Sequence, residues 1–136
     1  DYDIASTLAT AISQRLVRRI CPHCRKERPF NDKEKKIIQS IADKYGMQYD
    51  LDNAITYDSV GCSKCNNSGY VGRIACFEIL NLDEDIKELV MNGASSIEIR
   101  KCALKGTYRP LLVDGINKVV KGITTLDELN RKLKIF

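Results

Sequence analysis

Apolar residues recur at regular intervals near the start of the chain. Four of them follow one another every four positions: Leu8, Ile12, Leu16 and Ile20. This spacing is typical of one face of an amphipathic helix. Pro22 lacks the backbone N–H that a helix interior needs and would end it. The sequence therefore predicts a helix over residues 4–20.

A second helix is predicted over residues 31–45. Asn31 and Glu34 have the spacing of a capping box, in which each side chain accepts a hydrogen bond from the backbone of the other residue. Gly46 is a suitable terminator, because glycine readily adopts the left-handed conformation that ends helices. After this helix, the residue pattern predicts only a short extended segment, over residues 55–57.

After residue 81 the pattern favours four short helices. Ser95 with Glu98 and Thr125 with Glu128 repeat the capping-box spacing, so each pair marks a helix start. Pro110 opens the helix between them, because proline is tolerated in a first turn. These signals predict a helical region over residues 81–136.

A strand is predicted between the second helix and this helical region, over residues 70–80. Alternate residues would face opposite sides, and the two sets are Arg73, Ala75, Phe77 and Ile79 against Ile74, Cys76, Glu78 and Leu80. Both sets are mostly apolar, so the strand is expected to be buried on both faces. The fold class is accordingly α+β, mostly helical with a short β element.

Two CxxC pairs are the strongest chemical signal. Cys21 and Cys24 follow the first predicted helix, and Cys62 and Cys65 precede the strand. Each CxxC turn offers two sulfur atoms on one edge of a tetrahedron, the geometry that Zn²⁺ adopts with four thiolates. Such a closed site leaves no position for water, so the metal would be structural rather than catalytic.

Composition agrees with a metal site. Six cysteines without a secretory signal point to a reducing compartment, where paired cysteines are more often metal ligands than disulfides. The net charge is only +4. The stretch 15–28, however, contains one acid, Glu27, and six basic residues: Arg15, Arg18, Arg19, Arg25, Lys26 and Arg28. Near the metal, these cations would offset the double negative charge of a zinc–tetrathiolate centre.

Two alternatives remain open at this point. Cys21-Pro22-His23-Cys24 also occurs as the active-site sequence of thiol–disulfide oxidoreductases, although such motifs begin a helix and this one follows a predicted helix. A zinc-ribbon nucleic-acid-binding module would also suit the basic cluster. His23 is interpreted as a solvent-facing residue, and the remaining cysteines, Cys76 and Cys102, as buried core residues.

No catalytic motif accompanies the cysteines. The sequence has no GxxxxGK[ST] phosphate loop, no HExxH and no nucleophile elbow, and it has one histidine. We therefore expect no enzymatic activity from this chain alone.

Two longer motifs resemble a known family. One runs from Gln14-Arg15-Leu16 to Cys24, and the other combines Gly61-Cys62-x-x-Cys65 with Gly69-Tyr70-x-Gly72-Arg73 and Glu78-Ile79-Leu80. Together with the helical tail, they resemble the C-terminal part of the ATPases of type IV pilus assembly and type II secretion. The retraction ATPases of the same superfamily lack the cysteines, so the two pairs favour the assembly or secretion branch.

The resemblance implies an organisation for the whole chain. Residues 1–20 would be a helix from the end of a RecA-like ATPase domain, 21–69 a tetracysteine zinc-binding subdomain, 70–80 a strand returning to the edge of the ATPase sheet, and 81–136 a C-terminal helical subdomain. Arg15 and Arg73 would contact nucleotide or a neighbouring subunit, or serve only as surface ion-pair partners.

The resemblance also implies a function. The parent would be a hexameric cytoplasmic motor that uses ATP and Mg²⁺, with its nucleotide-binding motifs in a preceding part of the protein. Its partners would be neighbouring subunits and an inner-membrane platform protein, with no nucleic acid. Our prediction is a structural, force-transmitting fragment of this motor that lies at the inner face of the membrane through its partners; the alternative is a free-standing zinc-ribbon binding module.

Overall fold

The computed structural model describes residues 10–106 and 108–136. Its centre is a long antiparallel pair of strands, β1 (Thr10–Ile20) and β4 (Tyr70–Asn81). A second pair, β2 (Lys26–Pro29) and β3 (Ile55–Asp58), flanks it. Helix α2 (Asp32–Tyr45) lies between β2 and β3 in the chain. The remaining helices are α3 (Glu84–Met91), α4 (Ser96–Leu104), α5 (Leu111–Val120) and α6 (Leu126–Leu133).

The predicted N-terminal helix is wrong over its described part, because residues 10–20 form strand β1. The rest of that predicted helix, residues 4–9, lies outside the described residues. A spacing of four positions keeps side chains on one face of a strand as well as on one side of a helix. Ile12 and Leu16 accordingly share a face of β1, but that face is exposed. Pairing with β4 along the whole strand decides the conformation.

Strand β4 is confirmed where it was predicted, but its burial is one-sided. Cys76 is fully buried on the face that the helices cover, whereas Phe77 is 42% and Ile79 48% exposed. In the register of the pair, Ile12 lies opposite Ile79, so both strands contribute to the exposed apolar face. The expectation of burial on both faces was wrong because the described elements pack on only one side of this sheet.

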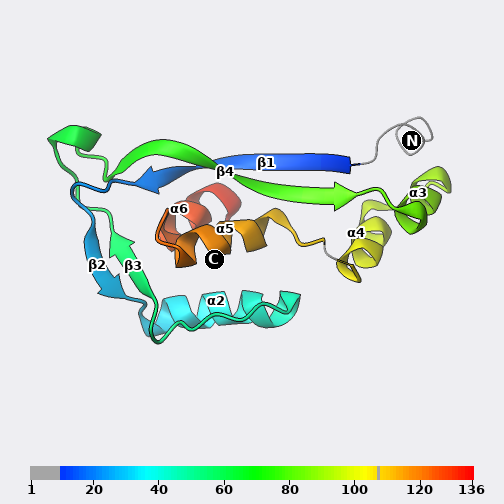
Figure 1. Ribbon diagram of the computed structural model, residues 1–136, viewed down its shortest axis with the longest axis horizontal. Helices are drawn as coiled ribbons and strands as arrows, with labels where there is room; N and C mark the ends of the chain where they lie inside the picture. The colour runs from blue at the N-terminus through cyan, green and yellow to red at the C-terminus, as the bar shows by residue number, and fades with distance from the viewer. Residues whose placement is uncertain (1–9, 107) are drawn as a thin grey trace.

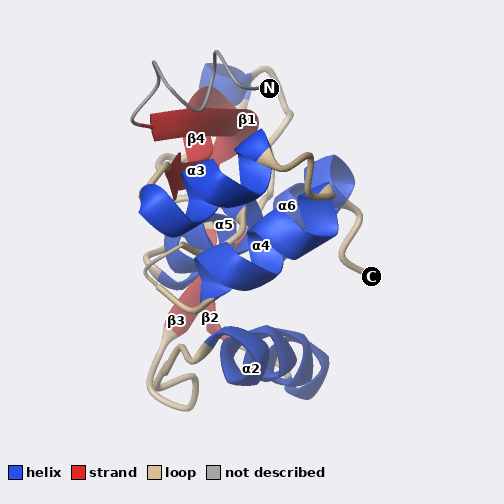
Figure 2. Ribbon diagram, turned by 90° about the vertical axis from the view of Figure 1, so that its right-hand side faces the viewer, coloured by secondary structure: helices blue, strands red, loops and turns tan. Residues whose placement is uncertain are grey.

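Three layers build the main core, as Figure 1 shows. Helices α5 and α6 lie between the β1–β4 pair and helix α2. Their buried residues share one cluster with Val17 of β1, Cys76 of β4 and Ile38 of α2. Helices α3 and α4 form a separate, smaller cluster around Ile86 at the far end of the strands, in front in Figure 2. The α+β class is therefore confirmed, but the expectation of only a short β element was wrong, because β1 pairs with β4 and β2 pairs with β3.

The predicted helix signals agree well with the observed helix ends. Asn31 and Glu34 form a complete capping box, and Gly46 ends α2 in the left-handed conformation with φ of 69°. Ser95 and Thr125 cap α4 and α6, each accepting from the backbone N–H three residues later. None of the helices in the described ranges is long and apolar enough to span a lipid bilayer.

A buried carboxylate joins the last helix to the first strand. The Glu128 side chain of α6 is fully buried. It accepts hydrogen bonds from the backbone N–H of Arg18 at 2.8 Å and from the guanidinium groups of Arg18 and Arg131. Burial disfavours the charged form, but the hydrogen bonds from Arg131 and Arg18 outweigh it and lower the pKa of Glu128 to about 2.

The Glu128 network predicts acid sensitivity. Its pKa falls from 4.5 to about 2 on folding. The resulting stabilisation is present above pH 4.5 and is lost as the pH falls toward 2; it amounts to about 3 kcal/mol. Urea unfolding between pH 6 and 2 should show this loss in the original chain. Glu128→Gln should already be less stable at pH 6, by about 3 kcal/mol, and should show a smaller pH dependence in this window.

Asp127→Asn is the matched control for Glu128→Gln, because Asp127 is the neighbouring, exposed acid of the same helix. It should keep the acid-dependent loss of stability. Equal pH profiles for the two variants would show that Glu128 does not carry the effect.

The close packing of α5 on α6 gives a second prediction. A Cβ atom at Gly115 would lie 2.5 Å from Cδ1 and 3.0 Å from Cδ2 of Leu129, which is fully buried. Gly115→Ala should therefore destabilise the chain by about 1–3 kcal/mol through overpacking. Gly106→Ala is the control, because a Cβ atom there would meet nothing nearer than 3.7 Å. Thermal unfolding of both variants measures the difference.

Candidate metal centre

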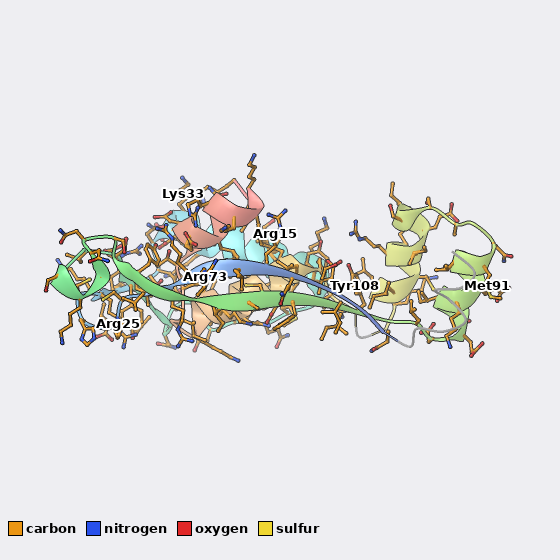
Figure 3. The ribbon with its side chains drawn as sticks, turned by 90° about the horizontal axis from the view of Figure 1, so that it is seen from above. Arg15, Arg25, Lys33, Arg73, Met91 and Tyr108 are labelled. Atoms are coloured by element: carbon orange, nitrogen blue, oxygen red, sulfur yellow. The ribbon has the colours of Figure 1, made fainter. Side chains whose placement is uncertain are left out.

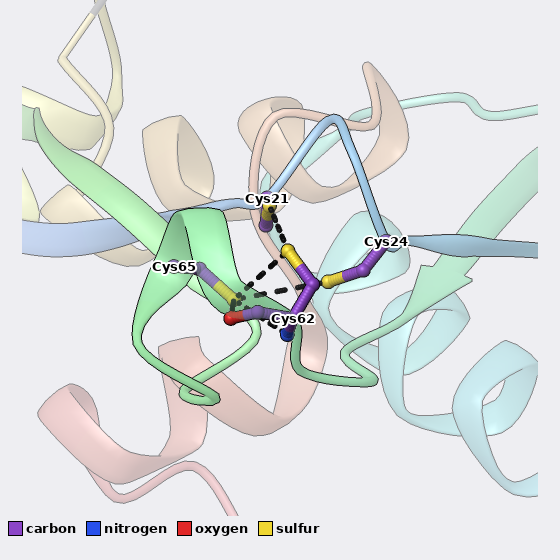
Figure 4. Close-up of side chains that lie close together, drawn as sticks. All are labelled: Cys21, Cys24, Cys62 and Cys65. Atoms are coloured by element: carbon purple, nitrogen blue, oxygen red, sulfur yellow. Dashed lines mark hydrogen bonds between the residues drawn. The ribbon is translucent and has the colours of Figure 1, made fainter.

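Two tight turns bring the four predicted cysteines together at one end of the β1–β4 pair. Cys21 and Cys24 lie in the turn between β1 and β2, where the backbone N–H of Arg25 donates to the carbonyl of Cys21. Cys62 and Cys65 lie in a turn that contains a short 3-10 helix (Ser63–Cys65) just before β4. The pairing of β1 with β4 places the two turns side by side, as Figure 4 shows.

The four sulfur atoms all lie within 4.8 Å of one another. Three of the separations are shorter: 3.8 Å between Cys21 and Cys62, 3.9 Å between Cys24 and Cys65, and 3.6 Å between Cys62 and Cys65. A regular tetrahedron with metal–sulfur bonds of about 2.3 Å has edges of roughly 3.8 Å. The cluster therefore has the size and the ligand chemistry of a four-thiolate metal site.

Backbone N–H groups point at two of the sulfur atoms. Gly61 donates to Sγ of Cys24 at 3.3 Å, and Cys62 and Gly69 each donate to Sγ of Cys65 at 3.2 Å. Hydrogen bonds of this kind stabilise a thiolate relative to a thiol. They come from the main chain of the turns, so the fold itself supplies donors that favour the thiolate forms of Cys24 and Cys65.

The thiol pKa values reflect this arrangement. Burial raises the pKa of Cys65, but the N–H groups of Cys62 and Gly69 outweigh it and lower the value to about 6. For Cys24, the Gly61 N–H lowers the pKa, while burial and the other three thiols raise it to about 11. A metal cation among the four would favour the thiolate of each. Loading of such a site must therefore release protons and weaken in acid.

Glycine is required at two positions of the second turn. Gly69 has φ of 82°, and a Cβ atom there would lie 2.5 Å from Cβ of Ser59. Gly61 has φ of 113°, and its Cβ atom would lie 2.9 Å from the carbonyl oxygen of Asn67. Both glycines donate N–H groups to sulfur, so the conformation that excludes a side chain also aims the hydrogen bonds.

Three residues of the basic cluster have side-chain partners other than the sulfur atoms. Arg18 pairs with Glu128, Arg28 pairs with Glu34 and Asp58, and Arg25 lies over the ring of Tyr57. Within the described ranges, the hydrogen bonds to the four sulfur atoms come from main-chain N–H groups and from the cysteines themselves. Charge counting over residues 15–28 missed these carboxylates because all three lie outside that stretch, and Asp58 and Glu128 are also distant in sequence.

The other candidate residues lie apart from the sulfur cluster. Arg15 is exposed on the helix-covered side of the strand pair, whereas Arg73 is exposed on the opposite side, across from Arg18 in the register. Figure 3 labels both arginines along the strands. The structure therefore does not bring them to one site. His23 is exposed, as expected.

The two remaining cysteines belong to the two apolar clusters. Cys76 is fully buried in the main core, and burial raises the pKa of its thiol. Cys102 packs against the smaller cluster and is half-buried, so its full burial was not borne out.

Comparison with known proteins identifies relatives along nearly the whole chain. Residues 1–131 match the family described as Type II/IV secretion system protein. A type IV pilus assembly ATPase PilB of Thermus thermophilus is 36% identical over 129 residues, which is 94% of this chain and 14% of that protein. The PilB of Myxococcus xanthus is 35% identical over 127 residues, or 93% of this chain and 21% of that protein.

A relative from the secretion branch is equally similar. The type II secretion system protein E of Aeromonas hydrophila is 34% identical over 128 residues, covering 94% of this chain and 24% of its own length. The chain thus spans between about one seventh and one quarter of these relatives. The match over residues 1–131 shows that the chain belongs to the type II/IV secretion system protein family.

Proposed function

We propose that this chain is the zinc-binding, force-transmitting part of a motor ATPase that powers type IV pilus assembly or type II secretion. The observation that carries the proposal is the spacing of the four sulfur atoms, which fits a tetrahedral four-thiolate site, in a chain of this family. Cys21, Cys24, Cys62 and Cys65 would hold one zinc ion. The ion would crosslink the two turns, and the four thiolates would leave no position for a reacting water.

The zinc ion would act as a clip at the end of the strand pair. It would tie the end of β1 to the start of β4 across the segment 21–69, which contains β2, α2 and β3. Binding of structural zinc contributes on the order of 10 kcal/mol to folding at neutral pH. Such a clip would make the strand pair rigid enough to pass nucleotide-dependent motion to a partner.

The strand pair would belong to the ATPase sheet of the parent. The N–H of Phe77 on the outer edge of β4 is already bonded to the carboxylate of Asp114, at 2.8 Å. By the alternation of antiparallel pairing, Ile12, Gln14 and Leu16 of β1 direct their backbone groups away from β4. Within residues 10–106 and 108–136, no hydrogen bond reaches these groups. The open edge and exposed apolar face of β1 would therefore be covered by the preceding part of the ATPase domain.

The activity of the whole motor depends on parts beyond this chain. The parent would hydrolyse ATP with Mg²⁺ as a hexamer, in contact with neighbouring subunits and an inner-membrane platform protein on the cytoplasmic side. This fragment would be structural rather than catalytic. Arg15 and Arg73 lie on opposite faces of the strand pair, so at most one of them would face a given nucleotide.

A thiol–disulfide oxidoreductase is less well supported. Cys21 is fully buried, and its sulfur atom lies 3.8 Å from that of Cys62 in the other turn. Such enzymes place the attacking, exposed thiol at a helix N-terminus, whereas Cys21 follows a strand. The free-standing zinc-ribbon module would predict DNA binding that weakens with salt.

Metal content tests the zinc assignment directly. The chain purified under reducing conditions without added metal should contain about one zinc ion, with four of its six thiols protected until a chelator is added. Elemental analysis and thiol titration measure both quantities. A metal-free folded protein whose Cys21 and Cys24 react at once would favour the oxidoreductase instead.

Cys62→Ser tests the structural role. It should lower the zinc content severalfold and lower the unfolding temperature, because three thiolates hold the ion less tightly. Cys102→Ser is the matched control, because Cys102 is a half-buried thiol away from the cluster. It should keep the zinc. Unchanged folding and zinc content in Cys62→Ser would contradict the proposal.

The same substitution tests force transmission in the full-length parent. We expect Cys62→Ser to reduce pilus output or secretion more strongly than ATP hydrolysis by the purified motor, because the clip would couple motion rather than cleave ATP. Cys102→Ser should leave both unchanged. Normal assembly or secretion by a zinc-free Cys62→Ser motor would contradict the coupling role. Absence of ATPase activity in the unaltered parent would contradict the motor assignment.

A further inference from the structure

A groove of about 820 Å³ lies on the helix-covered side of the strand pair. It opens between β1, the last turn of α2, the first turn of α5 and the residues that follow α6. Half-buried apolar side chains line its interior, among them Ile41, Leu111, Leu112 and Leu133. Its volume is within the range of about 300–1,000 Å³ that is typical of ligand pockets. We call it the basic groove because of the charges around it.

Four exposed cations border the basic groove, and each comes from a different part of the fold. They are Arg15, Lys44, Arg100 and Lys134. The side chains of Arg15 and Lys134 have no hydrogen bond or ion pair with any residue that the structure describes. Lys44 lies over the ring of Tyr45 at 5.4 Å but faces no carboxylate among the described ion pairs. These three charges are available to a ligand.

Glu78 is the only carboxylate among the described residues that line the groove, and its charge is already engaged. One oxygen accepts the backbone N–H of Leu111 at 3.1 Å, at the start of α5. The other lies 3.7 Å from the guanidinium of Arg100. Glu78 thus offsets Arg100 and the positive end of a helix, so the basic groove keeps a net positive charge.

We propose that the basic groove is a docking site for an acidic amphipathic segment of a partner protein. Carboxylates of the segment would pair with Arg15, Lys44 and Lys134, and its apolar side chains would contact Leu112 and Leu133 below them. The combination of an apolar floor and a cationic border favours a peptide that carries both kinds of side chain, as in helix-in-groove recognition. The inference rests on the geometry of this chain and does not require the parent to be an ATPase.

Two other polyanions fit the groove less well. Single-stranded nucleic acid is usually bound on aromatic side chains along an extended basic track, whereas Tyr45 is the one aromatic residue among those lining the described groove. An anionic membrane attracts basic residues on a surface that can lie flat against it, whereas this apolar floor is recessed.

The test uses the full-length parent protein and a synthetic probe. The probe is a fluorescent helical peptide of glutamate and leucine residues, with leucine at helical spacing on one face. Its partner probe has glutamine in place of every glutamate. Fluorescence anisotropy should show binding of the glutamate peptide, roughly tenfold weaker binding of the glutamine peptide, and loss of the difference at high salt.

Substitutions locate the binding. Arg15→Gln combined with Lys134→Gln should weaken the glutamate peptide roughly tenfold and leave the glutamine peptide unchanged. The matched control combines Lys36→Gln with Lys121→Gln, which removes the same charge from two exposed lysines outside the groove. Unchanged zinc content and thermal unfolding would show that both double variants are folded.

Several outcomes would overturn the proposal. The proposal is wrong if the two peptides bind with equal affinity, or if the two double variants lose equal affinity. It is also wrong if no peptide binds to the full-length protein, because other parts of the parent would then fill the groove. The Arg15/Lys134 double variant could instead lose binding to anionic vesicles or to an oligonucleotide while it still binds the peptide. That result would assign the groove to a membrane or to a nucleic acid, respectively. Zinc content is expected to be normal in all these cases, so failure of this proposal is distinct from failure of the zinc assignment.

Discussion

The convergence of four sulfur atoms at one end of the strand pair is the constraint on which the rest of the chain depends. β1 and β4 are paired along nearly their whole length, yet residues 21–69 lie between them in sequence. Closing so long a loop costs conformational entropy. The two cysteine turns meet where the chain leaves and rejoins the strand pair, so a metal there would offset this cost at the point where the segment is anchored. The packing of α2 on α5 then completes the core.

The second constraint acts from the other end of the chain. Glu128 binds the backbone and the guanidinium of Arg18, and the hydroxyl of Thr124 donates to the carbonyl of Arg18. These contacts lie just before Cys21 in the chain. Residues more than one hundred positions apart therefore hold the last part of β1 in place. The cysteine turns and the C-terminal helix adjoin the same short stretch of strand from two directions.

Much of this arrangement could be predicted because its signals are local. The two CxxC pairs predicted the sulfur cluster, and the capping pairs predicted the starts of α2, α4 and α6 within a residue. The predicted N-terminal helix was wrong in its described part because a spacing of four residues fits a strand as well as a helix. The roles of Arg18, Arg28 and Glu78 could not be predicted, because their partners Glu128, Asp58 and Leu111 come close only in the folded chain.

The two edges of the strand pair differ in a way that affects how the isolated polypeptide behaves. Asp114 occupies a backbone donor on the β4 edge, which blocks that edge to another strand. On the β1 edge, Glu128, Thr124 and Ile123 occupy the backbone groups of Arg18 and Ile20. The part of the edge at Ile12, Gln14 and Leu16 has no such guard among the described residues, and the side chains of Ile12 and Leu16 are exposed there. Exposed apolar edges are templates for intermolecular pairing. On its own, the chain is therefore expected to self-associate in one direction only, through this part of β1, and to form dimers rather than long fibrils.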